Sequence, residues 1–360
     1  MFNGKKILIT GVCGTVGSEL LRQLASSPYA PREICGLDNN ERGLFFQEQA
    51  YLNDARVVLG LGDVRDLQRV SAAMQGVDIV FHAAAFKHVV MCEKSPYEAV
   101  QTNIIGINNI ITAAANSGVE RVIFTSSDKA VNPTNVMGTS KLMGERLITA
   151  ANSDRKQIKT VFASTRFGNV LGSTGSVIPI FHRQIMKGGP VTLTEESMTR
   201  FIMSIAQAVR LVIETAGLAQ GGEVFITKMH VVRIADMARA MINELAPRYD
   251  FKPEQIDIKI IGSKPGEKLY EELMTEEEVR RTLELKDYFV VLPAFRQMYA
   301  GIEYRYPNKV SDHIAAPYSS RTQALMPQEA LHAFMREHGL YEAAGREDHP
   351  DQRYWPGDKK

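Results

Sequence analysis

Several residues that can exchange protons lie close together in the segment VIFTSSDKAVNPTNVMGTSKLMGERL. An apolar run typical of a strand ends there in Ser127, Asp128 and Lys129, and a predicted helix then carries Lys141. A carboxylate and an amine in one site can act as general base and general acid. Met137, four residues before Lys141, has a thioether that cannot exchange a proton. The segment therefore predicts acid–base chemistry.

A glycine-rich turn near the N-terminus predicts a dinucleotide-binding site. The strand KKILIT leads directly into GVCGTVGSELLRQL, so that Gly11, Gly14 and Gly17 lie between a strand and a helix. Glycines there let backbone amides and the helix N-terminus approach a pyrophosphate, although turns also use glycine for other reasons. Thr15 and Val16, at the start of this helix, are expected to lie against the same cofactor.

An acidic residue at the end of the second predicted strand favours NAD over NADP. Asp38 follows the last of these glycines by about twenty residues, where a carboxylate accepts from the adenosine ribose hydroxyls and repels a 2′-phosphate. Helix capping is the alternative role for Asp38. Asp63 and Val64 follow the third strand and are expected near the adenine, with helix capping again the alternative for Asp63.

The fourth predicted strand ends in small residues that are followed by two candidate substrate ligands. Ala83 and Ala84 in FHAAAFKHV permit close approach of a cofactor. Lys87 and His88 come next, at the carboxyl end of the strand, where open α/β sheets bind their ligands. His82, inside the strand, is interpreted as a core histidine rather than a catalytic group.

The hydrophobic pattern of the first half predicts a Rossmann-like, doubly wound parallel sheet of the α/β class. Runs rich in Ile, Val and Phe alternate with stretches whose apolar residues recur at three- and four-residue spacing. The predicted strands are residues 6–10, 33–37, 57–61, 79–82, 121–126 and 160–165. The predicted helices are residues 16–26, 67–74, 97–117 and 137–151.

The second half of the chain predicts a smaller, interleaved substrate domain. After residue 166 the sequence becomes rich in Gly and Ser (FGNVLGSTGSVIP) and its elements become shorter. The predicted division is an NAD-binding domain at 1–166 with 200–230 returning to it, a substrate-binding domain at 167–199 and 231–340, and a mobile tail at 341–360. The tail carries charge, Pro and Gly without periodicity.

Composition excludes several classes of protein. Lys and Arg total 42 against 41 Asp and Glu in 360 residues, which gives a net charge of +1. The chain therefore lacks the excess of positive charge that is typical of nucleic-acid-binding proteins. Cys13, Cys35 and Cys92 form no CxxC pair, so neither a disulfide framework nor a metal site is predicted. No apolar run approaches the roughly 18 residues that span a bilayer, and the opening is too short for a signal peptide. We expect a soluble cytoplasmic protein without a membrane partner.

These motifs together resemble the extended short-chain dehydrogenase/reductases. The shared features are the glycine turn (GxxGxxG here), the alanine-rich fourth strand, the TNIIGINN helix with Asn103 and a YxxxK-like site. Within that superfamily SSDKAVNP, RFGNVLGSTGSVIP, MTRFIMS and PGEKLYEEL resemble the nucleotide-sugar 4,6-dehydratases, in particular those acting on UDP-N-acetylglucosamine. The likeness covers roughly residues 1–290. Met137 departs from the superfamily's catalytic tyrosine and is similar to one branch of the dehydratases.

The resemblance implies an NAD-dependent, redox-neutral elimination. Hydride leaves sugar C4 for the cofactor, a base removes the C5 hydrogen, water leaves from C6, and the hydride returns to C6. Asp128, directly or through water with Ser127, is expected to accept the C4 hydroxyl proton and to serve as acid for the C6 hydroxyl. Lys129 is the expected C5 base, which requires a pKa lowered by burial or by Lys141. Lys141 is expected to hold the nicotinamide ribose, and the division of roles between Asp128 and Lys129 stays open.

The resemblance also implies contacts to the substrate, a nucleotide sugar. Asn169 matches a position near the diphosphate, and Arg200, Glu267 and Lys268 match positions near the nucleotide. Arginine suits a diphosphate because its guanidinium can donate two parallel hydrogen bonds. A surface salt bridge is the alternative for each of these residues.

Two rival functions stay open. A nucleotide-sugar 4-epimerase shares the fold and the C4 oxidation, but it needs a tyrosine or equivalent and has no use for a C5 base. A catalytically silent NAD-binding scaffold or regulator would bind cofactor and convert no nucleotide sugar. The resemblance further implies a homodimer or higher homo-oligomer through the helices with Asn103 and Lys141, and a product for surface polysaccharide. The C5 configuration and the choice of UDP or GDP are not predicted.

Overall fold

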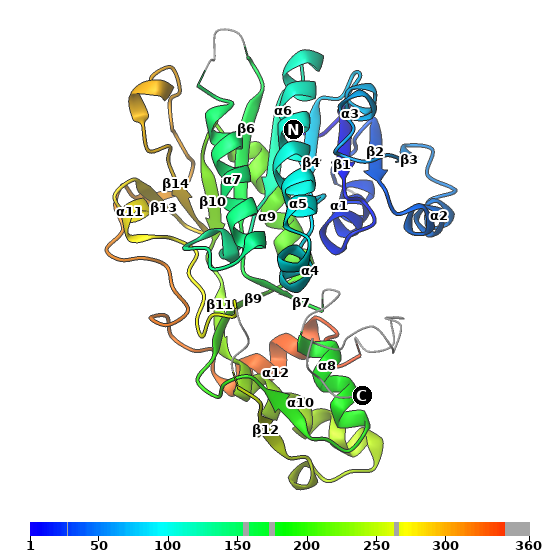
Figure 1. The fold of residues 1–360 in the computed structure, drawn as a ribbon, viewed down its shortest axis with the longest axis vertical. Helices are drawn as coiled ribbons and strands as arrows, with labels where there is room; N and C mark the ends of the chain where they lie inside the picture. The colour runs from blue at the N-terminus through cyan, green and yellow to red at the C-terminus, as the bar shows by residue number, and fades with distance from the viewer. Residues whose placement is uncertain (27, 154–157, 173–176, 263–265, 343–360) are drawn as a thin grey trace.

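A large, mostly parallel sheet forms the centre of the upper lobe (Figure 1). The computed structural model describes residues 1–26, 28–153, 158–172, 177–262 and 266–342. Within these residues the sheet has ten strands in the order β15-β13-β14-β10-β6-β5-β4-β1-β2-β3. Its parallel strands are β1 (Lys6–Thr10), β2 (Glu33–Asp38), β3 (Val57–Leu61), β4 (Ile79–His82), β5 (Arg121–Thr125), β6 (Val161–Arg166) and β10 (Val224–Thr227). The predicted doubly wound sheet is confirmed, and its strand order reverses between β1 and β4, which leaves a crevice at their carboxyl ends.

Helices cover both faces of this sheet. Alternate residues of a strand point to opposite faces, so Ile7 and Ile9 of β1 join one buried cluster and Leu8 joins another. The first cluster includes residues of α1 (Thr15–Ala25) and α9 (Ile205–Leu218), and the second includes residues of α3 (Leu67–Ala73), α6 (Gly106–Ser117) and α7 (Val136–Ala150). Because both faces of the central strands are buried, these strands are apolar along their length, which explains why the sequence pattern located them.

The helices differ from the prediction beside the crevice. α2 (Glu41–Ala50) and α4 (Val89–Lys94) were not predicted. α2 buries only Leu44, so its sequence has little apolar periodicity. The predicted helix 97–117 consists of α5 (Pro96–Val100), a π-helical turn (Gln101–Ile105) and α6.

Antiparallel strands extend the large sheet beyond β10. They are β14 (Tyr288–Val291), β13 (Thr282–Leu285) and β15 (Lys309–Ser311). The sequence-based division assigned these three strands to the substrate domain. Because they pair with the large sheet, they belong with the cofactor domain of that division. The division itself stays a prediction.

A second lobe lies below the large sheet in Figure 1. Its helices α8 (Val177–Met186), α10 (Ile234–Leu245) and α12 (Gln328–Glu337) share one buried cluster. Two small sheets accompany them: β7 (Asn169–Leu171) with β9 (Thr199–Ser204) and β11 (His230–Arg233), and β8 (Val191–Leu193) with β12 (Ile258–Ile260). The predicted tail lies outside the described residues from residue 343 onward. Among the residues that are described, no helix has the length and apolar character to cross a membrane, and no cluster of three or more His, Cys, Asp or Glu could hold a metal ion.

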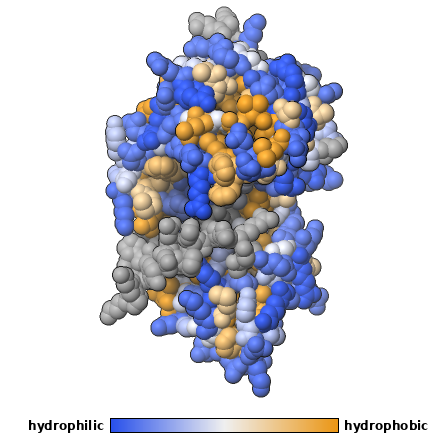
Figure 2. Space-filling model, turned by 90° about the vertical axis from the view of Figure 1, so that its right-hand side faces the viewer, coloured by the Kyte–Doolittle hydropathy of each residue, from blue (hydrophilic) through white to orange (hydrophobic). Residues whose placement is uncertain are grey.

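The β3 edge of the large sheet exposes apolar side chains. Figure 2 faces this side of the molecule and shows apolar surface on the upper lobe. Phe45 and Phe46 of α2 are 54% and 58% exposed, and Val58 and Leu61 of β3 are 49% and 56% exposed. Exposed apolar surface of this kind is typical of a contact with another molecule.

A buried ion-pair triad joins the sheet to the segments around the crevice. Arg166, the last residue of β6, is 1% exposed, and Glu145 on α7 and Glu278 on α11 (Glu276–Val279) are each 2% exposed. The guanidinium donates to Glu145 at 2.6 and 2.7 Å and to Glu278 at 2.8 and 2.9 Å. Burial alone would raise the pKa of Glu278, but the Arg166 charge and hydrogen bonds lower it to about 2.

Replacing Glu278 by Gln tests this triad. Its pKa of about 2 in the fold lies below the ordinary 4.5, so ionised Glu278 stabilises the fold fully above about pH 4.5 and progressively less as the pH falls towards 2. We expect E278Q to lower the free energy of unfolding by about 3 kcal/mol at pH 7, and by less at pH 4 and pH 3. Denaturant titrations of both proteins measure the difference, and an equal difference at all three pH values would contradict the assignment.

Candidate active site

The turn between β1 and α1 leaves no room for side chains at two of its glycines. Gly11 has a φ of +73°, and a Cβ added there would lie 2.6 Å from Ala84 N. A Cβ on Gly17 would overlap the Gly11 carbonyl oxygen. Gly14 is the N-cap of α1, so the positive end of that helix points into the crevice.

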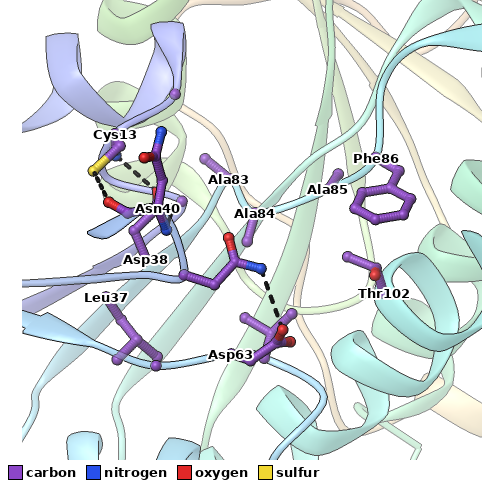
Figure 3. Close-up of a pocket in the computed structure, with 15 residues that line it drawn as sticks. Cys13, Leu37, Asp38, Asn40, Asp63, Ala83, Ala84, Ala85, Phe86 and Thr102 are labelled. Atoms are coloured by element: carbon purple, nitrogen blue, oxygen red, sulfur yellow. Dashed lines mark hydrogen bonds between the residues drawn. The ribbon is translucent and has the colours of Figure 1, made fainter. Parts of the chain in front are cut away.

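The crevice is a cavity at the carboxyl ends of β1, β2 and β4 (Figure 3). Its lining brings together seven of the predicted cofactor residues: Gly11, Gly14, Asp38, Asp63, Val64, Ala83 and Ala84. Gly17, Thr15, Val16 and Lys141 lie outside its lining. A crevice lined by a helix N-terminus and a nearby carboxylate fits the pyrophosphate and ribose of a dinucleotide.

Backbone amides hold the Asp38 carboxylate at the edge of this cavity. Cys13 N–H donates to Oδ2 at 2.8 Å and Asn40 N–H donates to Oδ1 at 2.9 Å. Asn40, not Asp38, caps α2. The carboxylate is therefore fixed where the prediction needs it, and the capping alternative is wrong.

Asp63 is paired within the chain. Arg65 donates to both of its oxygens, at 3.0 and 2.7 Å, and Asn39 Nδ2 donates at 3.2 Å. The hydrogen bonds from Arg65 lower the pKa of Asp63, against the opposing effect of burial. Asp66, not Asp63, caps α3, so the capping alternative is wrong here as well.

The loop after β4 is clamped by a buried asparagine. Asn103 lies in the π-helical turn, accepts from Phe86 N–H at 2.8 Å, and donates to Phe86 O at 3.0 Å and Ser140 Oγ at 2.9 Å. It thereby ties the loop at the cavity to α7. Lys87 and His88 follow Phe86 on an exposed stretch before α4, and they are not among the cavity-lining residues.

The turn after β5 brings a carboxylate and an amine into direct contact. Asp128 is 5% exposed and accepts from Ser127 Oγ at 2.9 Å and from Lys129 Nζ at 3.2 and 3.1 Å. A Cβ on Gly138 would overlap the Lys129 carbonyl oxygen, so glycine lets the start of α7 approach this turn closely. The predicted Ser127, Asp128 and Lys129 cluster is present.

The predicted electrostatics of Lys129 are wrong. Burial favours loss of its proton, but the Asp128 and Glu271 carboxylates outweigh burial and raise the pKa of Lys129 above its ordinary value. Lys141 is not among the main causes of this shift. In the free protein Lys129 is therefore an ammonium group paired with Asp128.

Lys141 has the opposite electrostatic character. Its side chain is 7% exposed, its Nζ donates to Thr125 O at 2.9 Å, and it lies 4.8 Å from the centroid of the Phe124 ring. Burial lowers its pKa to about 8. His82 is fully buried against Phe124 with a pKa lowered by burial to about 3, as expected for a neutral core histidine.

Met137 is part of an apolar cluster at the start of α7. It is 4% exposed and shares this cluster with the buried Cys92 and Ala99 and the half-buried Val89 and Val136. The position where the superfamily pattern has a tyrosine is thus occupied by a buried, apolar side chain.

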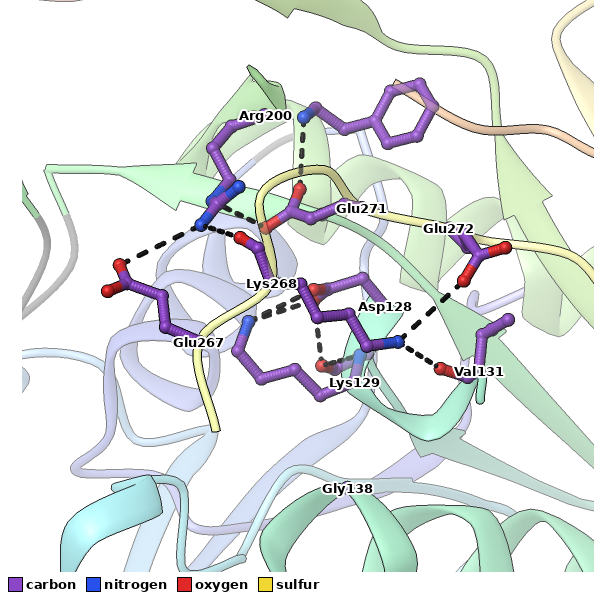
Figure 4. A network of polar contacts seen from close by, with 12 residues as sticks. Asp128, Lys129, Val131, Gly138, Arg200, Glu267, Lys268, Glu271 and Glu272 are labelled. Atoms are coloured by element: carbon purple, nitrogen blue, oxygen red, sulfur yellow. Dashed lines mark hydrogen bonds and ion pairs between the residues drawn. The ribbon is translucent and has the colours of Figure 1, made fainter. Parts of the chain in front are cut away.

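The segment 266–272 lies over the turn after β5 (Figure 4). Lys268 Nζ donates to Val131 O at 2.8 Å, and Asn135 Nδ2 donates to Gly266 O at 3.3 Å. Arg200, which is 8% exposed, donates to the carbonyl oxygens of Thr199, Lys268 and Leu269.

Arg200 also faces carboxylates rather than open space. Glu267 lies 3.8 Å from its Nη2 and Glu271 lies 3.4 Å from its Nε. The guanidinium expected to bind a diphosphate is therefore engaged within the chain. Asn169, the other predicted diphosphate residue, is half-buried at the start of β7, paired with Ile202 of β9.

Glu271 is a site residue that the sequence did not single out. It lies in the motif PGEKLYEEL, beside Arg200 and the Asp128 turn, and it is 3% exposed. Two adjacent glutamates end this motif, and no local periodicity shows which of them is buried. The only sequence signal was the number of charges in so short a motif.

Over residues 7–293 the chain matches a family described as polysaccharide biosynthesis protein. An uncharacterized membrane protein of Methanocaldococcus jannaschii is 48% identical over 93% of this chain and 96% of its own length. A protein of Campylobacter jejuni named UDP-N-acetylglucosamine 4,6-dehydratase (inverting) is 38% identical over 82% of this chain and 85% of its own length. Proteins of similar identity from Rickettsia are named UDP-glucose 4-epimerase.

Among solved structures, Pen from Bacillus thuringiensis superposes with a TM-score of 0.85 at 39% identity, covering 94% of this chain and 99% of that one. The match to the family profile spans most of the chain, and the fold and glycine turn agree with it. The chain belongs to the polysaccharide biosynthesis protein family, within the extended short-chain dehydrogenase/reductases that include the nucleotide-sugar dehydratases.

Proposed function

We propose that this protein is an NAD-dependent 4,6-dehydratase of a nucleotide-activated N-acetylhexosamine, with UDP-N-acetylglucosamine as substrate and a 4-keto-6-deoxy sugar for surface glycans as product. The observation that carries the proposal is the buried Asp128 in contact with Lys129, on a site where Met137 replaces the tyrosine. The Campylobacter relative named as a dehydratase of this sugar supports the choice of substrate.

The cavity residues fit a dinucleotide in a consistent way. The backbone around Gly11 and Gly14 and the N-terminus of α1 would hold the pyrophosphate, and Asp38 would accept from the adenosine ribose. Lys141, on α7, would donate to the nicotinamide ribose. When bound, the nicotinamide supplies reversible hydride transfer at the sugar.

Asp38→Ala tests the preference for NAD. Loss of the carboxylate removes an acceptor for the ribose hydroxyls and the repulsion of a 2′-phosphate. We expect the affinity for NADH to fall about tenfold, the loss of roughly one charge-assisted hydrogen bond, and the preference over NADPH to shrink. Fluorescence titration with both dinucleotides measures this. An unchanged NADH affinity would remove Asp38 from the cofactor site.

The chain's own groups account for the proton transfers in order. Asp128, already an acceptor for Ser127 and Lys129, takes the proton of the C4 hydroxyl as that carbon is oxidised. Protonated Asp128 no longer stabilises the charge on Lys129, so the Lys129 ammonium group releases its proton to solvent and becomes the neutral C5 base. Asp128 then returns its proton to the leaving C6 hydroxyl, and Lys129 returns its proton to C5 at the end.

The rival functions make different use of these groups. A 4-epimerase needs to deprotonate and reprotonate only the C4 hydroxyl, so a second base beside Asp128 would have no task. Because some relatives are named as epimerases, the epimerase function is kept as the alternative. A silent scaffold would have no reason to bury a charged pair beside the cofactor cavity, because burying charge is costly without a function.

Incubation with UDP-N-acetylglucosamine and NAD separates these functions. A dehydratase yields a product lighter by one water, an epimerase yields an isomer of the same mass, and a scaffold yields no product. We expect the lighter product from the wild type, and Asp128→Asn to lower kcat at least about 100-fold because an amide cannot accept the proton. Mass spectrometry measures both. Undiminished turnover by the Asn variant with normal cofactor content would overturn the role of Asp128.

Two further parts of the proposal concern assembly and location. We propose a homodimer or higher homo-oligomer through α5 to α7, supported by exposed apolar side chains there, with Tyr97 68%, Ile105 39% and Met143 46% exposed.

We also place the reaction in the cytoplasm, supported by three cysteines that are all free thiols.

A further inference from the structure

Glu271 is held rigidly between two elements of the site (Figure 4). Its Oε2 accepts from the backbone N–H of Phe201 at 3.0 Å, and its Oε1 lies 3.4 Å from Arg200 Nε. Its own backbone is fixed on both sides, because its N–H donates to Ser320 Oγ at 2.9 Å and its carbonyl oxygen accepts from Ser320 N–H at 2.8 Å. A carboxylate in this setting has one position.

Charges from three elements face this carboxylate. They are Asp128 and Lys129 on the turn after β5, Arg200 on β9, and Lys268 on its own segment. Glu267 and Glu272, on the same segment, pair with Arg200 and Lys268 instead. Burial, and next the Asp128 charge, raise the pKa of Glu271 to about 8, while Arg200 and Lys129 oppose the shift. Glu271 can therefore gain or lose its proton near neutral pH.

We propose that Glu271 is a positioning residue for Lys129: its negative charge keeps the proton on Lys129, and its neutralisation frees that amine to act as a base. The inference rests on the proposed function for its role in the reaction, whereas the charge coupling itself needs no substrate.

Charge balance supports this coupling. With Glu271 ionised, two carboxylates (Asp128 and Glu271) face two cations (Lys129 and Arg200). When Glu271 takes up a proton and Lys129 releases one to solvent, Asp128 and Arg200 remain as one pair. Lys129 can exchange with solvent because its side chain is 34% exposed. These four groups sum to zero charge in both states, which avoids the cost of an uncompensated charge among them.

Chemical labelling of Lys129 tests the coupling without substrate. Limiting acetic anhydride reacts with neutral amines, and mass spectrometry of the Lys129 peptide gives its rate between pH 6 and pH 10. We expect Glu271→Gln to label Lys129 roughly threefold to tenfold faster than the wild type at pH 8. Glu223→Gln is the matched control, because Glu223 is a fully buried carboxylate that accepts from the backbone of Gln220 and Gly221 at the start of β10. The control should label Lys129 at the wild-type rate.

A conservative variant and the reaction itself complete the test. Glu271→Asp keeps the negative charge, so Lys129 should be labelled as slowly as in the wild type. If the Gln variant folds poorly, the Asp variant still tests whether the charge controls the labelling. In the dehydratase assay, the acid limb of the kcat profile should move to lower pH in Glu271→Gln with little change in KM. Labelling and pH profiles that match the wild type in Glu271→Gln, or fast labelling in Glu271→Asp, would overturn the coupling. Faster labelling in a protein that converts no nucleotide sugar would instead sustain the coupling and refute the proposed function.

Discussion

The buried Arg166 triad is the interaction on which the site depends. Removing three charges from water is favourable only when every donor and acceptor is paired, and Arg166 meets that condition through Glu145, Glu278 and Leu273 O. The three partners come from β6, α7 and the stretch that ends in α11. Because the guanidinium fork accepts only one geometry for two carboxylates, these parts of the chain meet in one arrangement.

The positions of the charged residues around the turn after β5 follow from that arrangement. α7 presents Lys141 to the end of β5, and the stretch leading to α11 brings Lys268 and Glu271 over the turn that holds Asp128 and Lys129. Each cation of this cluster pairs with at least one carboxylate: Lys129 with Asp128, Arg200 with Glu271, and Lys268 with Glu272. Met137 packs in an apolar cluster at the start of α7. A site without the usual tyrosine thus retains groups that can accept and return protons.

The sequence predicted the parallel half of the fold closely because its strands are apolar along their length, and its central strands are buried on both faces. β1, β3 and β4 have the predicted bounds, and the glycine turn and Asp38 lie at the cavity as expected. β13 and β15 could not be predicted in this sheet, since their pairing depends on contacts far along the chain. α2 escaped detection because it is mostly exposed.

The sequence located the charged residues of the site better than it predicted their protonation and their pairing. The types and spacing of Asp128 and Lys129 located the pair, but the pKa of Lys129 depends on Glu271, which approaches only through the fold. Arg200 was assigned to a diphosphate from its type, whereas its donors meet carbonyl oxygens and carboxylates of segment 266–272. Burial and long-range pairing determine both the pKa of Lys129 and the partners of Arg200, and no local sequence pattern shows them.

The central claim is that the charged turn after β5 removes and returns the proton at sugar C5. The reaction of UDP-N-acetylglucosamine in deuterated water, followed by NMR of the product, tests this most directly. We predict a 4-keto-6-deoxy product that carries deuterium at C5 in the wild type. Recovery of a sugar that has exchanged no hydrogen at C5 and has lost no water would contradict the account.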